Sequence, residues 1–311
     1  MYGSEAGEPT ACPVGRLAGE VSLDDALVRV VFGPSGVSRT HGVIGTTAAA
    51  NRRFYDALWS ASSLVPPQRF STWPLLSTLA ASAPARLEIG PGLRPRLSIP
   101  GTFFVDLSPP ALSSLKARGG LATLGDVSAL PFPDRTFDLV CAFDIVEHVE
   151  NDRQVFRELG RVARDDAAVV FSVPLHAARW SAFDVLVGHV RRYDPDHLLA
   201  TLREHSFVLE QSAAFGMQPR SGWLLDLAVW GLTQRRAQAL RWYNRVILPL
   251  GLVLQRRLAW ASGLIDVAKV DELLLVCRRD GRRSLRQTAA TQESNVSVAR
   301  RCRLDDRRPT S

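Results

Sequence analysis

Two stretches decide how this chain folds: Arg86-Leu87-Glu88-Ile89-Gly90-Pro91-Gly92, and Phe103-Phe104-Val105-Asp106, whose aspartate stands eighteen residues after Glu88. The first is a short apolar run with an acidic residue that passes into a Gly-x-Gly turn, and the second ends in an aspartate. In an open α/β sheet, ligands bind outside the carboxyl ends of the strands, where strand order reverses. Glycines let the backbone approach a nucleoside, and an acid on the next strand accepts hydrogen bonds from both ribose hydroxyls. The two stretches therefore predict a nucleoside-cofactor site.

Further apolar runs alternate with helical patterns along the chain. A third acid follows a third short apolar run in Gly125-Asp126-Val127, and Phe137 to Phe143 has the composition of a buried strand. Apolar residues recur at helical spacing between Gln154 and Val162, and Ala167 to Pro174 is the next apolar run. Strands that alternate with helices predict a parallel sheet with right-handed crossovers.

The alternation continues toward the C-terminus. Pro195 to His205 has the pattern of an amphipathic helix, and Phe207 to Gln211 that of a strand. Asp271 to Cys277 is expected to be the last strand.

With these motifs in this order, the chain resembles the class I S-adenosylmethionine-dependent methyltransferases, in particular the small-molecule branch that includes the quinone C-methyltransferases. The resemblance runs from Asn51 to Arg279. It implies an α/β, Rossmann-like, mostly parallel seven-stranded sheet of order 3-2-1-4-5-7-6, with helices on both faces and an antiparallel last strand. It also implies S-adenosyl-L-methionine as the cofactor.

The resemblance assigns cofactor-binding roles to residues at the strand ends. The turn after the first strand would hold the methionine part of the cofactor, the second acid the ribose, and the third acid with the next backbone unit the adenine. The residues after the fourth strand would line the reacting side. The implied cofactor-binding residues are Glu88, Gly90, Pro91, Gly92, Asp106, Leu107, Asp126, Val127 and Phe143.

The glycine turn departs from the family pattern at two points. Arg94 stands where a third glycine is expected, and the spacing from Glu88 to Asp106 is shorter than usual. Pro95 and Pro100 lie in this segment, and proline disfavours a helix interior. The first helix is therefore expected to be one turn long or absent. Arg94 either pairs with the methionine carboxylate or is an exposed arginine.

Catalytic residues are sought near the cofactor, because aligning a nucleophile with an activated methyl group supplies much of the rate. An oxygen or carbon acceptor also needs a base. Histidine titrates near neutral pH, and the catalytic candidates are His148, His189 and Tyr193. A structural role is the alternative for each. Glu147 and His176 are further candidate bases, and Arg191 with Arg192 either holds an anionic acceptor or is solvated.

The segment 216–270, between the last two strands, is expected to be a helical insert. It carries four of the seven tryptophans, Trp223, Trp230, Trp242 and Trp260, interleaved with arginines. Its longest uncharged run is too short to span a bilayer. A cap on the sheet is one interpretation, and an interfacial helix or a hydrophobic acceptor site is the other. The second would imply a lipid-like acceptor and peripheral contact with a membrane.

Composition sets the remaining expectations. Residues 1–50 read as a partly disordered extension, 51–280 as the methyltransferase domain, and 281–311 as a disordered arginine-rich tail that carries most of the net charge of +7. The four cysteines have neither disulfide nor metal spacing, so no metal site is expected. The cysteines fit a reduced, cytoplasmic setting. The interfacial interpretation of the segment 216–270 would add peripheral contact with the inner face of the membrane. Oligomeric state is not predicted.

The prediction is thus a methyltransferase that acts on a small or lipid-like acceptor, with three alternatives. A nicotinamide-dependent oxidoreductase is disfavoured because the third glycine is missing and Asp126 would have no role. A non-enzymatic methyltransferase-like subunit is permitted by Arg94 and the shortened helix. A nucleic-acid methyltransferase is disfavoured because Asp144-Ile145-Val146-Glu147 stands where an Asn-Pro-Pro-aromatic or Asp-Pro-Pro-aromatic motif is expected.

Overall fold

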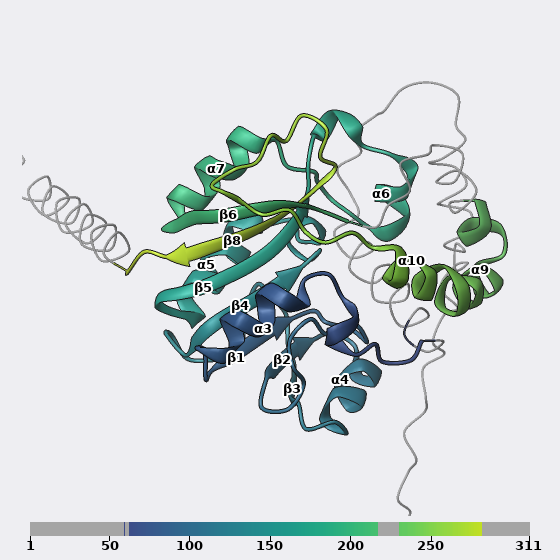
Figure 1. Cartoon of the computed structure of the whole chain (residues 1–311), viewed down its shortest axis with the longest axis horizontal. Helices are drawn as coiled ribbons and strands as arrows, with labels where there is room; N and C mark the ends of the chain where they lie inside the picture. Colours follow the sequence, from purple (N-terminus) through teal and green to yellow (C-terminus); the bar gives the residue numbers. More distant parts are fainter. Residues whose placement is uncertain (1–58, 60–61, 217–229, 282–311) are drawn as a thin grey trace, which may run out of the picture. The chain divides into compact units, whose positions relative to one another are not determined.

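A computed structural model describes residues 59, 62–216 and 230–281 (Figure 1). The expected N-terminal extension 1–50 and nearly all of the expected tail lie outside these residues. The domain boundaries therefore stay predictions. None of the helices in the described ranges combines the length and apolar character needed to cross a bilayer.

The core is a single mixed sheet of order β3-β2-β1-β4-β5-β8-β6-β7. The first five strands pair in parallel, and β8 lies antiparallel between β5 and β6. The predicted order is confirmed, because β8 is the expected antiparallel last strand. One strand is additional: the two-residue β7 comes from the insert and pairs with the edge of β6. The strands are β1 (Arg86–Ile89), β2 (Phe103–Asp106), β3 (Leu121–Leu124), β4 (Phe137–Phe143), β5 (Ala163–Pro174), β6 (Phe207–Phe215), β7 (Ala261–Ser262) and β8 (Glu272–Arg279).

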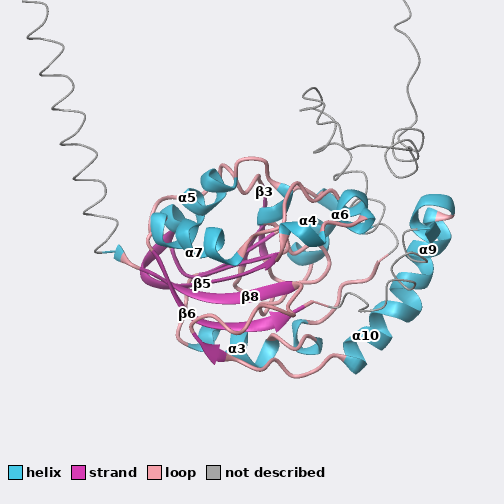
Figure 2. Cartoon of the chain, turned by 90° about the horizontal axis from the view of Figure 1, so that it is seen from above, coloured by secondary structure: helices cyan, strands magenta, loops and turns pink. Residues whose placement is uncertain are grey.

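Helices cover both faces of the sheet, and Figure 2 shows α5 and α7 on one side of the strands and α3 on the other. Alternation along β4 explains this, because Val140 and Ala142 pack on one face while Leu139 and Cys141 pack on the other. The helical elements are η1 (Pro67–Arg69), α3 (Trp73–Ala81), α4 (Pro109–Lys116), η2 (Val146–His148), α5 (Asp152–Val162), η3 (Ala177–Arg179), α6 (Ala182–Val187), α7 (Pro195–Glu204), α9 (Arg236–Trp242), η4 (Tyr243–Ile247) and α10 (Leu248–Leu254).

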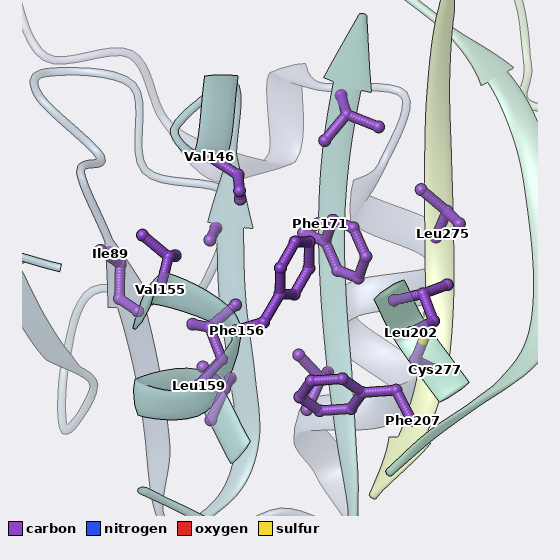
Figure 3. Packing of buried hydrophobic residues seen from close by; sticks show 14 of the residues in the cluster. Ile89, Val146, Val155, Phe156, Leu159, Phe171, Leu202, Phe207, Leu275 and Cys277 are labelled. Atoms are coloured by element: carbon purple, nitrogen blue, oxygen red, sulfur yellow. The ribbon is translucent and has the colours of Figure 1, made fainter. Parts of the chain in front are cut away.

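The larger core cluster lies between the sheet and helices α5 and α7. Phe156 of α5 packs edge-to-face on Phe171 of β5, and Phe207 lies beside it (Figure 3). The sequence predicts α5 from its apolar spacing, and the helix begins two residues before the predicted Gln154. Asn151 explains this start, since its side chain accepts a hydrogen bond from the Gln154 amide.

The segment between β1 and β2 contains no helix, although all of residues 90–102 are described. This confirms the expectation from Pro95 and Pro100. The Glu88 carboxylate holds the segment instead, because it accepts hydrogen bonds from the backbone amides of Arg96 and Leu97 at 2.8 to 3.0 Å. A buried side chain thus satisfies donors that a helix would have satisfied with its own carbonyls.

Candidate functional site

The carboxyl ends of β1, β2 and β4 meet at one edge of the sheet, because β1 pairs in parallel with both neighbours. β1 is also where the chain order reverses, since β2 lies on one side of it and β4 on the other. This is the position at which open α/β sheets bind ligands. The turn after β1, Asp106 of β2 and the segment 144–148 after β4 therefore lie at the predicted cofactor edge.

The turn after β1 requires glycine at two positions. Gly90 and Gly92 have φ angles of +63° and +52°, which L side chains rarely adopt. A Cβ on Gly90 would lie 2.2 Å from Ile145 Cδ1, and one on Gly92 would lie 2.1 Å from Trp59 Cζ2. The backbone of the turn is thus in close contact with neighbouring side chains, with Pro91 fixing the residue between the glycines.

Asp106 is held by the backbone. Its Oδ2 accepts a hydrogen bond from the Gly92 amide and its Oδ1 one from the Ser108 amide, both at 2.8 Å. These two hydrogen bonds fix the orientation of the carboxylate at the end of β2. The adjacent Leu107 side chain is 48% exposed and offers an apolar surface to a ring. The pair suits a ribose with its base.

The loop after β3 carries the third acid. Asp126 is exposed, and its Oδ1 accepts hydrogen bonds from the Ser128 amide and hydroxyl at 2.7 and 2.6 Å. Val127 is buried beside it. The loop therefore presents a fixed carboxylate at the end of β3.

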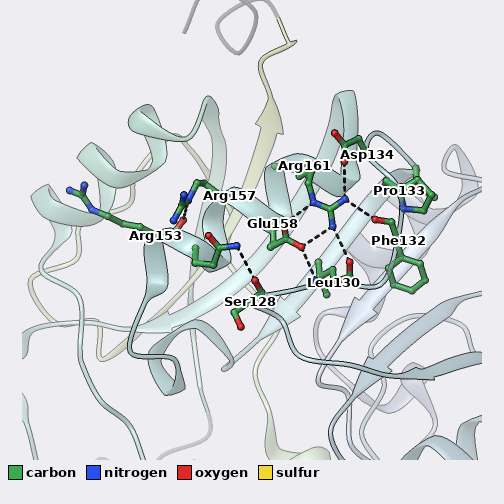
Figure 4. A network of polar contacts seen from close by, with 12 residues as sticks. Ser128, Leu130, Phe132, Pro133, Asp134, Arg153, Arg157, Glu158 and Arg161 are labelled. Carbon is green, nitrogen blue, oxygen red and sulfur yellow. Dashed lines mark hydrogen bonds and ion pairs between the residues drawn. The ribbon is translucent and has the colours of Figure 1, made fainter. Parts of the chain in front are cut away.

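An arginine on α5 anchors this loop (Figure 4). Arg161 donates to the carbonyls of Leu130 and Phe132 at 2.9 and 2.7 Å and to Glu158, whose Oε2 accepts from the Leu130 amide at 2.7 Å. Salt bridges to Glu158 and Asp134 hold the guanidinium in place. The predicted adenine-binding loop is thus tied to the helix that follows β4.

The side chain of Glu88 points into the protein interior. Its side chain is 1% exposed, and burial raises the pKa of its carboxyl to about 7, against the lowering by the Leu97 and Arg96 amides. These amides use both carboxylate oxygens. Glu88 therefore positions the segment that carries the turn.

Arg94 is not the exposed arginine of one sequence interpretation. Its guanidinium lies between the rings of Trp59 and Tyr243, at 5.2 and 5.1 Å from their centroids, and donates to the Tyr243 hydroxyl at 3.1 Å. Its Nε and Nη2 are buried and have no hydrogen-bond partner in the structure. Two buried donors beside the glycine turn suit a carboxylate, which is the other interpretation.

Phe143, predicted to line the cofactor, is buried at the end of β4. Its ring packs 6.4 Å from that of Phe215, and the guanidinium of Arg96 lies 5.6 Å from its centroid. Arg96 also stacks on Phe70 at 3.8 Å. Burial lowers the pKa of Arg96, while Asp144 and Glu88 raise it. The sequence did not single out Arg96, because stacking between residues from separate segments leaves no local pattern.

The structure brings His148 and His189 together, with ring centroids 4.8 Å apart. His148 Nδ1 lies 3.1 Å from the Gly188 carbonyl, and burial lowers the pKa of this ring to about 4. His189 Nδ1 lies 2.8 Å from Asp184 Oδ1. Because a carbonyl and a carboxylate only accept, each ring donates through Nδ1.

Asp184 was missed from the sequence. It is fully buried and accepts hydrogen bonds from Ser181 and from Arg192 Nε at 2.8 Å as well as from His189. Although burial opposes it, these donors hold the pKa of Asp184 well below its usual range. The Ser-x-x-Asp spacing of a capping box at the start of α6 was the available signal.

Glu147, the residue before His148, is also 1% exposed. Its Oε1 lies 3.7 Å from His189 Nε2, and its Oε2 is buried without a hydrogen-bond partner in the structure. Burial, and then the neighbouring Asp144, raise the pKa of Glu147 well above its usual value. The two histidines and this glutamate form one cluster after β4.

Tyr193, the third catalytic candidate, packs in the core. Its hydroxyl donates to Asp152 Oδ2 at 2.9 Å, and burial raises the pKa of the phenol well above its usual value. Asp152 also pairs with Arg191 at 2.6 Å, and Arg192 donates to Asp184. Both arginines therefore have carboxylate partners within the protein. His176 lies against the Val267 carbonyl, with its Nε2 2.9 Å from that oxygen.

Comparisons with known proteins bear on this site. A family model described as a methyltransferase domain matches residues 98–171. The curated ajmaline N-methyltransferase of Rauvolfia serpentina is 34% identical over 53 residues, which are 17% of this chain and 18% of that protein. The chain thus matches less than a fifth of the length of that relative.

Similar solved structures include two described as S-adenosylmethionine-dependent methyltransferases. One, from Thermotoga maritima and described as a possible histamine N-methyltransferase, has a TM-score of 0.45 at 12% identity, covering 75% of this chain and 92% of that one. The other, from Mesorhizobium loti, has a TM-score of 0.42 at 15% identity, covering 69% and 100% of the two chains.

Proposed function

We propose that this chain, whose residues 98–171 match a family model described as a methyltransferase domain, transfers a methyl group from S-adenosyl-L-methionine to a small or lipid-like acceptor. The observation that carries the proposal is the arrangement around Asp106. One buried carboxylate is fixed by the amides of Gly92 and Ser108 beside the exposed Leu107. An acid held in this way suits the two ribose hydroxyls of the cofactor.

The other residues at the strand ends fit the remaining parts of the cofactor. Asp126 and Val127 would meet the adenine, and the backbone of Gly90 to Gly92 would meet the methionine part. The two unpartnered donors of Arg94 would take the methionine carboxylate. When bound, the cofactor supplies a methyl group already activated by its sulfonium.

We propose that the acceptor meets the protein at the cluster of Glu147, His148 and His189. This cluster begins directly after β4, next to the turn after β1. Both histidines donate through Nδ1, so the lone pair of each ring is on Nε2. Tyr193 supports this region from the core through Asp152.

Calorimetric titration with S-adenosylmethionine, S-adenosylhomocysteine and NADH tests the cofactor assignment. Micromolar binding of both sulfur nucleosides, lost in Asp106→Ala and absent for NADH, is expected. The matched control is Asp196→Ala, an exposed aspartate in the first turn of α7, outside the network that holds the loop after β3. No binding of either sulfur compound would favour a non-enzymatic subunit, and binding of NADH would favour an oxidoreductase.

A lipid-like acceptor is supported by the insert. Leu240 of α9 packs with Leu93 beside the turn after β1, whereas Leu248 and Leu252 of α10 pack with Val65 and Phe70. This run of helices thus adjoins the site. On its exposed side large apolar residues are accompanied by exposed arginines, as suits the surface of an anionic membrane. The apolar residues are Trp242, Val246, Ile247, Leu250, Val253 and Leu254, and the arginines are Arg235, Arg241, Arg245, Arg256 and Arg257.

We therefore propose that the protein binds peripherally to the cytoplasmic face of a membrane through α9 and α10. Co-sedimentation with phosphatidylcholine vesicles, with and without phosphatidylglycerol, tests this. Binding that needs the anionic lipid and is lost in Trp242→Glu/Leu250→Glu is expected. Equal binding by this variant would exclude the helix face as the contact. The branch resemblance to quinone C-methyltransferases stays a prediction until an acceptor is found.

A further inference from the structure

Two histidines and a glutamate converge after β4, from segments forty residues apart. Ligand-capable atoms of Glu147, His148 and His189 all lie within 4.8 Å of one another. Two of these residues belong to the short helix η2 after β4, and the third follows α6. The sequence predicted no metal site, on the spacing of its cysteines, and the separation of these three residues resembles no familiar metal-binding spacing.

The hydrogen bonds of the two imidazoles leave both lone pairs on Nε2. His148 Nδ1 donates to the Gly188 carbonyl and His189 Nδ1 to Asp184 Oδ1. A histidine that ligates a metal commonly donates its other ring nitrogen to a carbonyl or a carboxylate, which fixes the tautomer and the ring orientation. Both partners of that kind are present here.

Glu147 supplies the negative charge. Its Oε1 lies 3.7 Å from His189 Nε2, a distance too long for a hydrogen bond. Its Oε2 is buried and has no hydrogen-bond partner in the structure. The lone pair of His189 Nε2 therefore faces an oxygen of Glu147 in a buried place, which is unfavourable unless a proton or a metal ion lies between them.

The supporting residues are themselves rigid. Gly188 ends α6 in the left-handed conformation, with a φ angle of +78°. This turn brings the His189 ring within hydrogen-bond distance of Asp184. Arg192 and the Ser181 capping box hold Asp184, and the Val190 amide donates to the Glu147 carbonyl at 2.8 Å. The cluster is thus fixed from both sides.

We propose that Glu147, His148 and His189 bind a divalent transition metal ion, with zinc as the best match. Two imidazoles and one carboxylate form a catalytic zinc set that leaves a coordination position open, whereas magnesium prefers oxygen ligands and water. In a tetrahedral zinc site neighbouring ligand atoms lie about 3.4 Å apart, as bonds of about 2.1 Å require. The separation of 3.7 Å between Glu147 Oε1 and His189 Nε2 is close to this value.

The role of the ion rests on the proposed function. Its open position would take an oxygen of the acceptor beside the transferable methyl group, and a bound hydroxyl group loses its proton more readily next to a divalent cation. In this arrangement the histidines act as ligands and the hydroxyl proton passes to solvent water, while the C–S bond of the sulfonium breaks as the new O–C bond forms. Metal binding itself can be measured whether or not methyl transfer occurs.

The proposal is tested by titrating the full chain with metal ions after a chelator has stripped it of metal and the chelator has been removed. The titrants are Zn²⁺, Co²⁺ and Mg²⁺. Binding is measured by calorimetry and, for cobalt, also by the visible absorption of the bound ion. One ion per chain is expected for zinc and cobalt, with no comparable binding of magnesium. His189→Ala and His148→Gln should each weaken zinc binding more than about 100-fold, and Asp184→Asn about 10- to 100-fold.

His176→Ala is the matched control, because this histidine lies against the Val267 carbonyl outside the cluster and should leave zinc affinity unchanged. S-adenosylhomocysteine binding is measured on the same samples. A variant that loses zinc but still binds this nucleoside is folded, and failure of the metal proposal is thereby distinguished from failure of the proposed function. Zinc binding that survives both His189→Ala and His148→Gln, or that is absent from the wild type, would overturn the proposal.

Discussion

Replacing Glu88 by glutamine should make the stability of the protein less sensitive to pH. Burial raises the pKa of the Glu88 carboxyl from 4.5 to about 7 in the folded state. A raised folded-state pKa contributes stability that is fully present below pH 4.5 and is lost as the pH rises through about 7. The wild type should therefore lose stability from this group between acid and mildly alkaline pH, and the glutamine variant should not.

The size of the effect follows from linkage. With pKa values of 4.5 in the unfolded and about 7 in the folded state, Glu88 binds more protons in the folded state at every pH between these two values and for some distance beyond them. Integration gives a loss of about 2 kcal/mol between about pH 5.5 and about pH 8.5. His148 acts in the opposite direction, because burial lowers the pKa of its ring to about 4. The contribution of Glu88 is therefore visible only as a difference between two variants.

The assay is urea unfolding of wild type and Glu88→Gln at both pH values, with Glu150→Gln as an exposed control. Glutamine keeps only one oxygen for the amides of Arg96 and Leu97, which adds a cost of about 1 kcal/mol that does not depend on pH. The stability advantage of the wild type over the variant should shrink by about 2 kcal/mol on going to the higher pH. An advantage that stays constant, or grows with pH, would refute the assignment of a buried, raised-pKa carboxyl to Glu88.

Three further perturbations have expected outcomes. Gly92→Ala should cost about 1–2 kcal/mol of stability because its backbone is left-handed, and more because the new Cβ displaces Trp59. In a Trp59→Ala background, urea unfolding should show only the backbone cost. An equal cost in both backgrounds would contradict the close contact between Gly92 and Trp59. Tyr193→Phe should lower stability by about 1 kcal/mol, because the half-buried Asp152 loses one of its donors, while calorimetry finds unchanged S-adenosylhomocysteine affinity. A large loss of affinity would show a role in the site. Arg161→Ala should weaken S-adenosylhomocysteine binding about 10-fold, as expected for losing roughly 1.4 kcal/mol of loop ordering, and unchanged binding would mean that the loop after β3 is held in other ways.

Much of the fold was determined by short-range patterns in the sequence. The apolar runs predicted β1, β2, β4 and the last strand, and the two prolines after β1 predicted the missing helix. These features are local, because strand and helix periodicity and the proline ring act within a few residues. The strand order came from the family resemblance and is confirmed, apart from the added β7, whose two residues are too few to give a pattern.

Only the tertiary structure decided how the site is built. Arg94 stacks between Trp59 and Tyr243, which are 184 residues apart in the sequence, and the Gly188 turn places His189 against Glu147. Such contacts form when distant segments close over one sheet edge, so no local propensity records them. Burial follows from the same closure. The buried Glu88 therefore binds the backbone amides of the segment after β1. The sequence by itself determined which chemical groups stand at the strand ends, whereas packing determined how those groups are buried and which residues hold them in place.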